Sequence, residues 1–195
     1  MKAYYEARAF EYDDWWNGTG LFAARERPGW RAARDELIAT LQALPPARTL
    51  DVACGTGFLT QHLPGRVTGL DASSSMLELA ASRVPEAAFV EGDALRLPFA
   101  DGTFERLFTG HFYGHLDDPE RSRFLTEARR VADELVVVDS ALRPDVVPEE
   151  LQERVLDDGS RWQVYKRYFT ADGLAAELGG GVTLLGNQWF VAVRA

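Results

Sequence analysis

Two glycines stand directly after a predicted strand, and an acidic residue lies within that strand. Residues 48–53 are predicted to form the strand, which contains Asp51, and Gly55 and Gly57 follow it. Glycines at such a turn let a ligand approach the backbone closely, and the N-terminus of the next helix offers free N–H groups. In open parallel sheets, ligands bind at the carboxyl ends of the strands. A glycine pair by itself is equally compatible with a tight turn that binds nothing.

Two further acidic residues follow the next two predicted strands. Asp71 ends the strand predicted at 66–71, where a carboxylate can accept two hydrogen bonds from the hydroxyls of a ribose. Asp93 comes after the strand predicted at 87–91, where it can accept a hydrogen bond from an adenine amino group. The alternatives are a helix N-cap for Asp71 and an ordinary turn residue for Asp93.

In their order and spacing, three segments resemble the successive motifs of the class I S-adenosylmethionine-dependent methyltransferases. These segments are residues 51–57, 69–77 and 92–99. The chain is similar to the small-molecule type that includes ubiquinone and menaquinone methyltransferases, over residues 45–140 and more weakly beyond them. The resemblance implies an S-adenosylmethionine cofactor and methyl transfer to a small-molecule acceptor, with the acceptor atom (O, N or C) left open.

The resemblance also implies a role for individual residues. Asp51 would orient the methionine part of the cofactor, Asp71 would hold the ribose, and Tyr12, in an N-terminal helical lid, would touch the methionine end. Ala53 stands where the family often has a glycine, and we expect binding to survive this change. The implied cofactor-binding residues are Tyr12, Asp51, Ala53, Gly55, Gly57, Asp71, Ala72, Met76, Asp93, Ala94 and Thr109.

The segment that follows the fourth predicted strand contains the candidate catalytic residues. His111 or His115 can act as a general base, and Tyr113 can orient the acceptor. Either histidine is equally compatible with a role that only anchors the loop. The two histidines are four residues apart, but Gly114 between them disfavours the regular helix that a metal-binding pair would need, so no metal site is predicted.

Three residues before the last predicted helix are candidates for an acceptor pocket. They are Tyr165, Arg167 and Tyr168, and an arginine there indicates an anionic or carbonyl-bearing acceptor.

The elements that must position these residues alternate between strands and helices. Strands are predicted at 48–53, 66–71, 87–91, 104–109 and 135–139, and helices at 4–16, 28–44, from Asp118, after Pro148 and at 171–178. A hairpin around Gly186 and Asn187 follows. With the resemblance, this order predicts one α/β domain: a Rossmann-like three-layer sandwich with seven mostly parallel strands and an antiparallel last strand. Residues 1–44 would form the helical lid and residues 45–195 the core.

Composition limits the classes of partner. The 195 residues carry a net charge of −9, which disfavours binding to nucleic acid. Cys54 is the single cysteine, which suits a reducing compartment, and no stretch approaches the ~20 apolar residues of a membrane span. We therefore expect a cytoplasmic protein, whose oligomeric state the sequence does not indicate.

Two other functional classes remain open. A nicotinamide oxidoreductase also needs a glycine-rich turn and an acid after the second strand, but Thr60 stands where its third glycine should fall. A non-catalytic module that binds S-adenosylmethionine would carry the same cofactor motifs, and a substrate-dependent release of S-adenosylhomocysteine would separate it from an enzyme.

Overall fold

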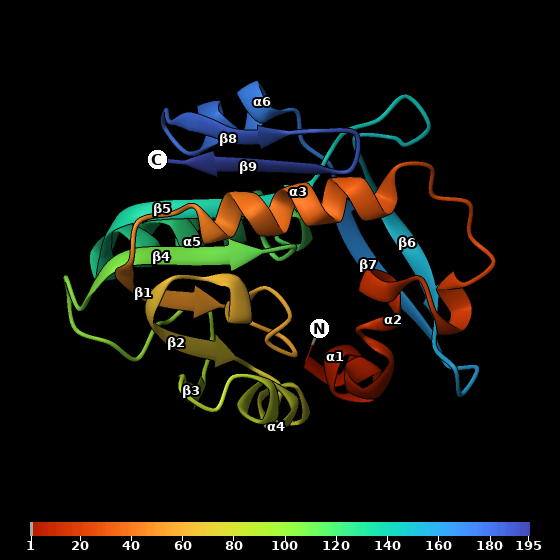
Figure 1. The fold of residues 1–195 in the computed structure, drawn as a ribbon, viewed down its shortest axis with the longest axis horizontal. Coiled ribbons are helices and arrows are strands. Elements are labelled where there is room, and N and C mark those ends of the chain that lie inside the picture. The colour runs from red at the N-terminus through yellow and green to blue at the C-terminus, as the bar shows by residue number, and fades with distance from the viewer. Residues whose placement is uncertain (1) are drawn as a thin grey trace.

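Seven strands form one mixed sheet in the computed structural model, which describes residues 2–195 (Figure 1). Their spatial order is β3-β2-β1-β4-β5-β9-β8. The first five strands are parallel, and β9 is antiparallel to both of its neighbours. The strands are β1 (Ala47–Val52), β2 (Gly65–Asp71), β3 (Ala88–Glu91), β4 (Phe104–Gly110), β5 (Ala132–Ser140), β8 (Val182–Gly186) and β9 (Phe190–Arg194). The predicted seven-stranded sheet with an antiparallel last strand is confirmed, and its winding direction reverses between β1 and β4.

Helices cover both faces of this sheet. In β5, Leu135 and Val137 pack in one apolar cluster with α5 and α6, while Val136 and Val138 pack on the opposite face with α3. This alternation produces the apolar run that is typical of a strand buried on both sides. The three layers predicted from the sequence are therefore present. The helices are α3 (Trp30–Gln42), α4 (Ser74–Arg83), α5 (Asp118–Val131) and α6 (Ala171–Glu177).

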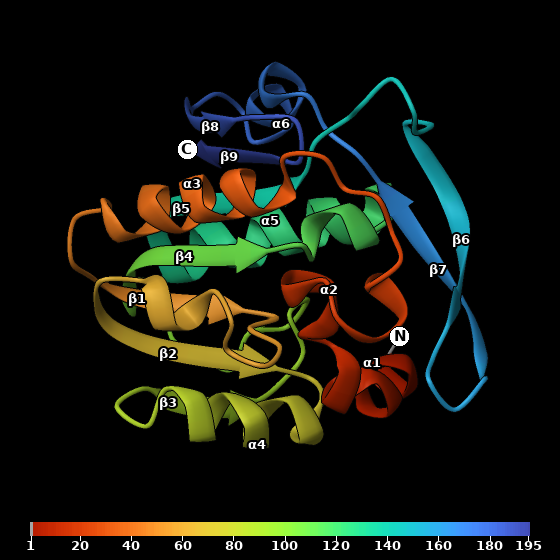
Figure 2. The same cartoon turned by 45° about the vertical axis from the view of Figure 1, so that its right-hand side comes forward.

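The N-terminal segment lies over the carboxyl ends of β1 and β2 (Figure 2). The single helix predicted at 4–16 is broken into α1 (Lys2–Arg8), a 3-10 turn (Ala9–Glu11) and α2 (Asp14–Asn17), with another 3-10 turn at Gly20–Phe22. Asp13, at the break, accepts a hydrogen bond from the Thr56 hydroxyl at 2.6 Å. Glu6 accepts from the backbone N–H of Ser74 at 2.9 Å. These contacts tie the segment to the loops that follow β1 and β2.

A two-stranded hairpin stands apart from the main sheet and lies beside the N-terminal helices in both views (Figures 1 and 2). It consists of β6 (Glu149–Val155) and β7 (Arg161–Arg167). Tyr4 of α1 packs against its inner face in a small apolar cluster with Leu156 and Val164. The prediction of a helix after Pro148 is therefore wrong. Pairing with β7 overrides the low strand propensity of the Glu- and Gln-rich segment.

Side-chain caps fix the starts of α5 and α4. The N-cap of α5 is Asp117, which forms a capping box with Glu120. Ser73 caps α4, and its hydroxyl accepts from the Met76 N–H at 3.2 Å. Short 3-10 turns at Thr60–His62 and Tyr113–His115 complete the elements. Within residues 2–195, every helix is too short or too polar to cross a bilayer.

Candidate functional site

A cavity of about 200 Å³ opens at the carboxyl ends of the central strands, where the winding direction reverses. Its wall is formed by the loops after β1, β2, β3 and β4 and by the N-terminal helices. The sequence-predicted residues that line it are Tyr12, Ala53, Gly55, Asp71, Ala72, Met76, Asp93, Ala94 and His111. The structure thus brings together residues that are almost 100 positions apart in the chain.

The loop after β1 bends through three residues in the left-handed region. Their φ angles are 56° at Ala53, 55° at Gly55 and 75° at Gly57. Gly57 does not line the cavity: a Cβ there would lie 3.2 Å from the Cα of Ala80 in α4, so this glycine permits close helix packing. Ala53 is strained at such a φ, which gives a physical reason why glycine is favoured at this position.

Asp71 lines the cavity, and its carboxylate can accept more hydrogen bonds than the protein itself donates to it. Its Oδ2 accepts from the Gly55 N–H and its Oδ1 from the Ser73 N–H, both at 2.9 Å. Burial raises the pKa of Asp71, while these backbone hydrogen bonds oppose the rise. Each carboxylate oxygen can accept a second hydrogen bond, so the pair suits two neighbouring hydroxyls. The alternative role of Asp71 as the N-cap of α4 is excluded, because Ser73 holds that position.

The part of the cavity beyond Asp71 is an apolar slot with a carboxylate, that of Asp93, at its edge. Met76 is almost fully buried in its wall, beside Ala72, Ala94 and Phe112. One oxygen of Asp93 accepts from the Leu95 N–H at 2.8 Å, which is the turn role considered from the sequence. Because this bond occupies only one carboxylate oxygen, Asp93 can also accept from a donor inside the cavity.

Asp51 lies behind the glycine loop. Its Oδ2 accepts from the Thr60 hydroxyl at 2.6 Å. Burial raises the pKa of Asp51 to about 7, with the Thr60 bond opposing the rise and the Asp71 charge adding to it. Asp51 lines a small hollow of about 20 Å³ that shares Tyr12 and Ala53 with the main cavity. A cationic group bound there would complement its charge.

Thr109 does not line the cavity. Its side chain is fully buried, and its hydroxyl donates to the Val52 carbonyl oxygen at 2.8 Å, which joins β4 to β1. Thr109 therefore stabilises the pairing of β4 with β1.

His111 is a buried residue with an unsatisfied atom. It has a φ of 57°, and its ring lies 4.9 Å from the ring of Trp15 and 5.2 Å from that of Trp16. Its Nδ1 lies 3.4 Å from the Ser140 hydroxyl and 4.0 Å from an Asp139 oxygen, while its Nε2 has no hydrogen-bond partner among residues 2–195. Burial lowers the pKa of His111 to about 3, with Asp139 opposing that shift, so the ring is neutral at physiological pH.

His115 lies beside the cavity wall, and its Nδ1 is 2.7 Å from the Tyr165 carbonyl oxygen. This contact assigns the proton to Nδ1, since a carbonyl oxygen only accepts. The ring stands 6.4 Å from that of Tyr5, which lines the cavity. Burial lowers the pKa of His115 well below its usual value, so it is also neutral.

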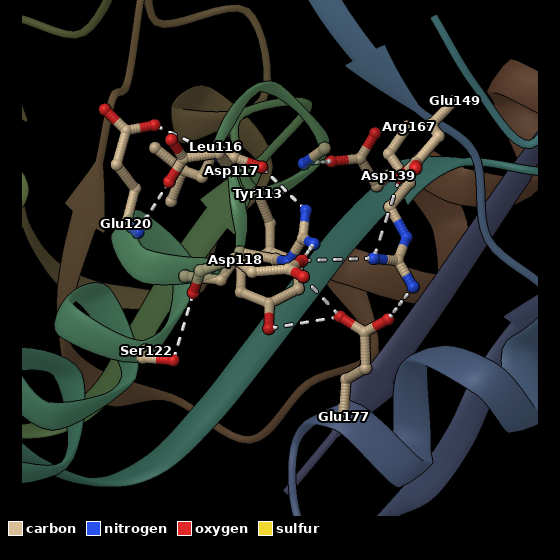
Figure 3. A network of polar contacts seen from close by, with 12 residues as sticks. Tyr113, Leu116, Asp117, Asp118, Glu120, Ser122, Asp139, Glu149, Arg167 and Glu177 are labelled. Carbon is tan, nitrogen blue, oxygen red and sulfur yellow. Dashed lines mark hydrogen bonds and ion pairs between the residues drawn. The ribbon is translucent and has the colours of Figure 1, made fainter.

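The structure does not bring Tyr113 to the cavity. Its side chain is buried in the core, and its hydroxyl lies 3.5 Å from a Glu177 oxygen within the network drawn in Figure 3. Arg167, a candidate for the acceptor pocket, belongs to the same network and binds Glu177 and Asp118. Both residues therefore hold α5, α6 and β7 together.

Sequence reasoning missed a buried ion pair beside the two histidines. Lys166 Nζ lies 2.5 Å from Asp139 Oδ1, and the other oxygen of Asp139 accepts from the Gly114 N–H at 2.7 Å. Burial by itself would raise the pKa of Asp139, but Lys166 and His111 hold it below its usual value. The alternation of polar and apolar residues in 161–167 indicates an inward-facing Lys166, but only if that segment is recognised as a strand.

A metal-binding cluster of three or more His, Cys, Asp or Glu side chains is not found within the part of the chain that the structure describes.

The fold and the cavity define a Rossmann-like class of protein that binds a ligand at the reversal between β1 and β4. Residues 49–134 match the model of a family described as "Methyltransferase domain". A demethylmenaquinone methyltransferase from Thermotoga maritima is 38% identical over 107 residues, which cover 52% of this chain and 44% of that protein. The chain spans about half the length of the curated relatives it matches.

Solved structures resemble nearly the whole chain. The structure described as "DhpI-SAM-HEP complex" has a TM-score of 0.75 at 23% identity and covers 98% of this chain and 94% of that one. The structure described as "DhpI-SAH complex structure" has a TM-score of 0.72 at 25% identity, with 98% and 92% covered. The likeness in fold thus extends over nearly the whole chain, well beyond residues 49–134, the segment that matches the methyltransferase-domain model.

Proposed function

We propose that this protein binds S-adenosylmethionine in the cavity at the β1–β4 reversal and transfers its methyl group to a small-molecule acceptor. The observation that carries the proposal is Asp71, whose two oxygens are fixed by backbone N–H groups and keep acceptor capacity toward the cavity. The match of residues 49–134 to a methyltransferase-domain model and the likeness to a solved structure whose description names SAM support the same cofactor.

The residues of the cavity fit the parts of this cofactor. Asp71 would accept from the ribose hydroxyls, and the slot around Met76 would take the adenine, with Asp93 at its edge. Asp51 would face the amino group of the methionine part, and Tyr12 would cover it from the N-terminal segment that precedes α3. The ring faces of tyrosines suit a sulfonium cation. When bound, the cofactor supplies an electrophilic methyl group on a positively charged sulfur.

The chain's own contribution to the reaction is positioning. The acceptor atom's lone pair forms the new bond to the methyl carbon while the carbon–sulfur bond breaks, and the sulfur becomes a neutral thioether. His111 and His115 are neutral, so each has a ring nitrogen that can accept a hydrogen bond from an acceptor hydroxyl or amine and orient it. Because burial lowers the pKa of both rings, full proton transfer to either one is disfavoured. Tyr113 has no place in this proposal.

Calorimetric titration of the purified protein with S-adenosylhomocysteine tests the cofactor assignment, with NADH in a parallel cell. We expect only S-adenosylhomocysteine to bind, because the site suits an adenosyl group with a cationic amino acid. Asp71→Ala should weaken binding by ~1.5–3 kcal/mol, as expected for lost hydrogen bonds to a charged group.

The matched control is Asp133→Ala, which removes an exposed carboxylate at the start of β5 and should leave the affinity unchanged. Binding of NADH, or equal binding by the Asp71 and Asp133 variants, would contradict the proposal.

A further inference from the structure

Two arginines on the lid side of the cavity form no ion pair within the described residues, although Arg8 is near enough to Glu11 to oppose the rise that burial causes in the pKa of its carboxyl. Arg8 is buried: it donates to the Tyr4 hydroxyl at 2.9 Å, and its guanidinium lies 4.8 Å from the centre of the Tyr12 ring. Arg154 is half-buried on β6 and donates to the Gln152 side chain at 2.8 Å. Within residues 2–195, neither guanidinium lies within 4.0 Å of a carboxylate. Partly desolvated charges of this kind are normally paired.

Other arginines of the same chain are paired. Arg106, which is also buried, binds Glu134, and Arg121 binds Asp118. Lys166, on the same face of the hairpin as Arg154, is neutralised by Asp139. The unpaired positive charge of Arg8 and Arg154 is therefore a local feature. It contrasts with the net charge of −9 of the whole protein.

Both arginines act on the same side chain, Tyr5. Burial raises the pKa of Tyr5, and the charges of Arg154 and Arg8 oppose that rise. Tyr5 lines the cavity, and its ring lies 6.4 Å from those of Tyr12 and His115. The positive charge thus converges on the wall of the cavity nearest to His115.

Arg154 reaches the histidines electrostatically as well. Burial is the main cause of the lowered pKa of His111 and His115, and the charge of Arg154 adds to the lowering of both. The geometry agrees: Arg154 is the cross-strand partner of Trp162, and Trp162 packs in the same apolar cluster as Tyr4 and Tyr5, so Arg154 lies on the face of the hairpin that meets α1.

The same region has polar atoms without partners. Tyr5 and Tyr12 line the cavity, and neither phenol hydroxyl makes a hydrogen bond to another group within the described residues. Guanidinium and phenol groups are donors, and a guanidinium matches the geometry of a carboxylate or phosphate group. Together they form a site that a small oxyanion would satisfy.

We propose that the acceptor carries an oxyanion group, a carboxylate or a phosphate-type group, which Arg154 and Tyr5 hold between the N-terminal helices and the β6–β7 hairpin, with Arg8 behind them. This inference rests on the proposed function and names the chemical class of its acceptor. It assigns the binding role to Arg154 of β6, whereas the sequence pattern pointed to Arg167, which is committed to Glu177.

The test uses protein saturated with S-adenosylhomocysteine and three probes: inorganic phosphate, acetate and the neutral acetamide. Nuclear magnetic resonance titration of ¹⁵N-labelled protein follows the amides around Tyr5 and Arg154. We expect saturable shifts with phosphate or acetate, and the stronger of the two distinguishes the phosphate from the carboxylate class. Acetamide should give none.

Variants separate the site from general electrostatics. Arg154→Gln should weaken binding of the anion at least tenfold, and Arg154→Lys should retain part of it. Arg161→Gln is the matched control, because Arg161 is exposed on the same hairpin and binds Glu153. It should leave the affinity for the anion within twofold of wild type.

Two results would overturn the inference. One is the absence of saturable anion binding to a protein that binds S-adenosylhomocysteine, and the other is equal anion affinity in the Arg154→Gln and Arg161→Gln variants. The calorimetric affinity for S-adenosylhomocysteine is measured first in each protein. If the wild-type protein does not bind S-adenosylhomocysteine, the proposed function is contradicted. If it binds S-adenosylhomocysteine but no anion, only the oxyanion acceptor is contradicted.

Discussion

Replacing Asp51 with asparagine should make the protein more stable at alkaline pH and at the same time weaken its cofactor site. The pKa of Asp51 is raised to about 7 in the folded protein, against an ordinary value of about 4 in the unfolded chain. A raised pKa means that folding favours the protonated form. The ionised carboxylate therefore lowers stability progressively as the pH rises from about 4 to about 7, and fully above that range.

The magnitude follows from the size of the shift. Three pKa units correspond to about 4 kcal/mol, which is the upper limit of the gain in the free energy of unfolding of Asp51→Asn at pH 8. Asparagine retains an oxygen that can accept from the Thr60 hydroxyl, so the hydrogen bond survives. At pH 5 the carboxylate in the folded wild type is largely protonated, and the gain should be about 1–2 kcal/mol.

Urea denaturation at pH 5 and pH 8 measures this difference, with Asp133→Asn as the control substitution at an exposed aspartate. Calorimetry on the same proteins gives the second half of the prediction. Wild-type affinity for S-adenosylhomocysteine should increase as the pH rises from 6 to 7.5, because the cationic amino group binds the ionised Asp51. The variant should bind more weakly at pH 7.5, without this pH dependence. A stability gain that is the same at both pH values would falsify the reasoning about burial.

Two further predictions concern the loop and the ion pair behind the cavity. Ala53→Gly should raise the free energy of unfolding by ~0.5–1 kcal/mol, because it relieves a left-handed φ of 56°, and chemical denaturation would show no gain if that residue is unstrained. Asp139→Ala should lower stability by ~3–5 kcal/mol, because it leaves the Lys166 ammonium buried and unpaired. Adding Lys166→Met to that variant should recover much of the loss in the same measurement, and a purely additive double variant would show that the two charges are not coupled.

The strands of the parallel half could be predicted because their sequences carry redundant signals. β1 and β2 each combine β-branched and other apolar residues with an acid at or near the carboxyl end, and a glycine turn or a serine cap follows. The same local chemistry makes the cavity predictable, since Asp71, Gly55 and Asp93 owe their positions to strand ends. Their convergence follows from parallel pairing alone.

The β6–β7 hairpin could not be recognised in the same way. Residues 149–155 contain three glutamates, and only alternate positions are half-buried, so the segment lacks the apolar stripe of a buried strand. The sequence feature that indicates a hairpin here is the Asp158-Gly159 pair, which is typical of a tight turn, and Gly159 has a φ of 82° in the structure. The position of Tyr113 shortly after β4 predicts that it lies in the site, but a 3-10 turn directs its side chain into the core.

The way α1 is attached has a consequence for the response of the protein to salt. On one side α1 packs on the hairpin through Tyr4 and Val164, and this apolar contact is insensitive to ionic strength. On the other side it meets the sheet through charged groups, namely Lys2 with Glu91 at 2.7 Å and Glu6 with the N-terminus of α4. Such exposed charge contacts weaken as salt screens them. High ionic strength should therefore loosen α1 from β3 and α4 while it stays on the hairpin, so that ligand exchange becomes faster on that side of the cavity.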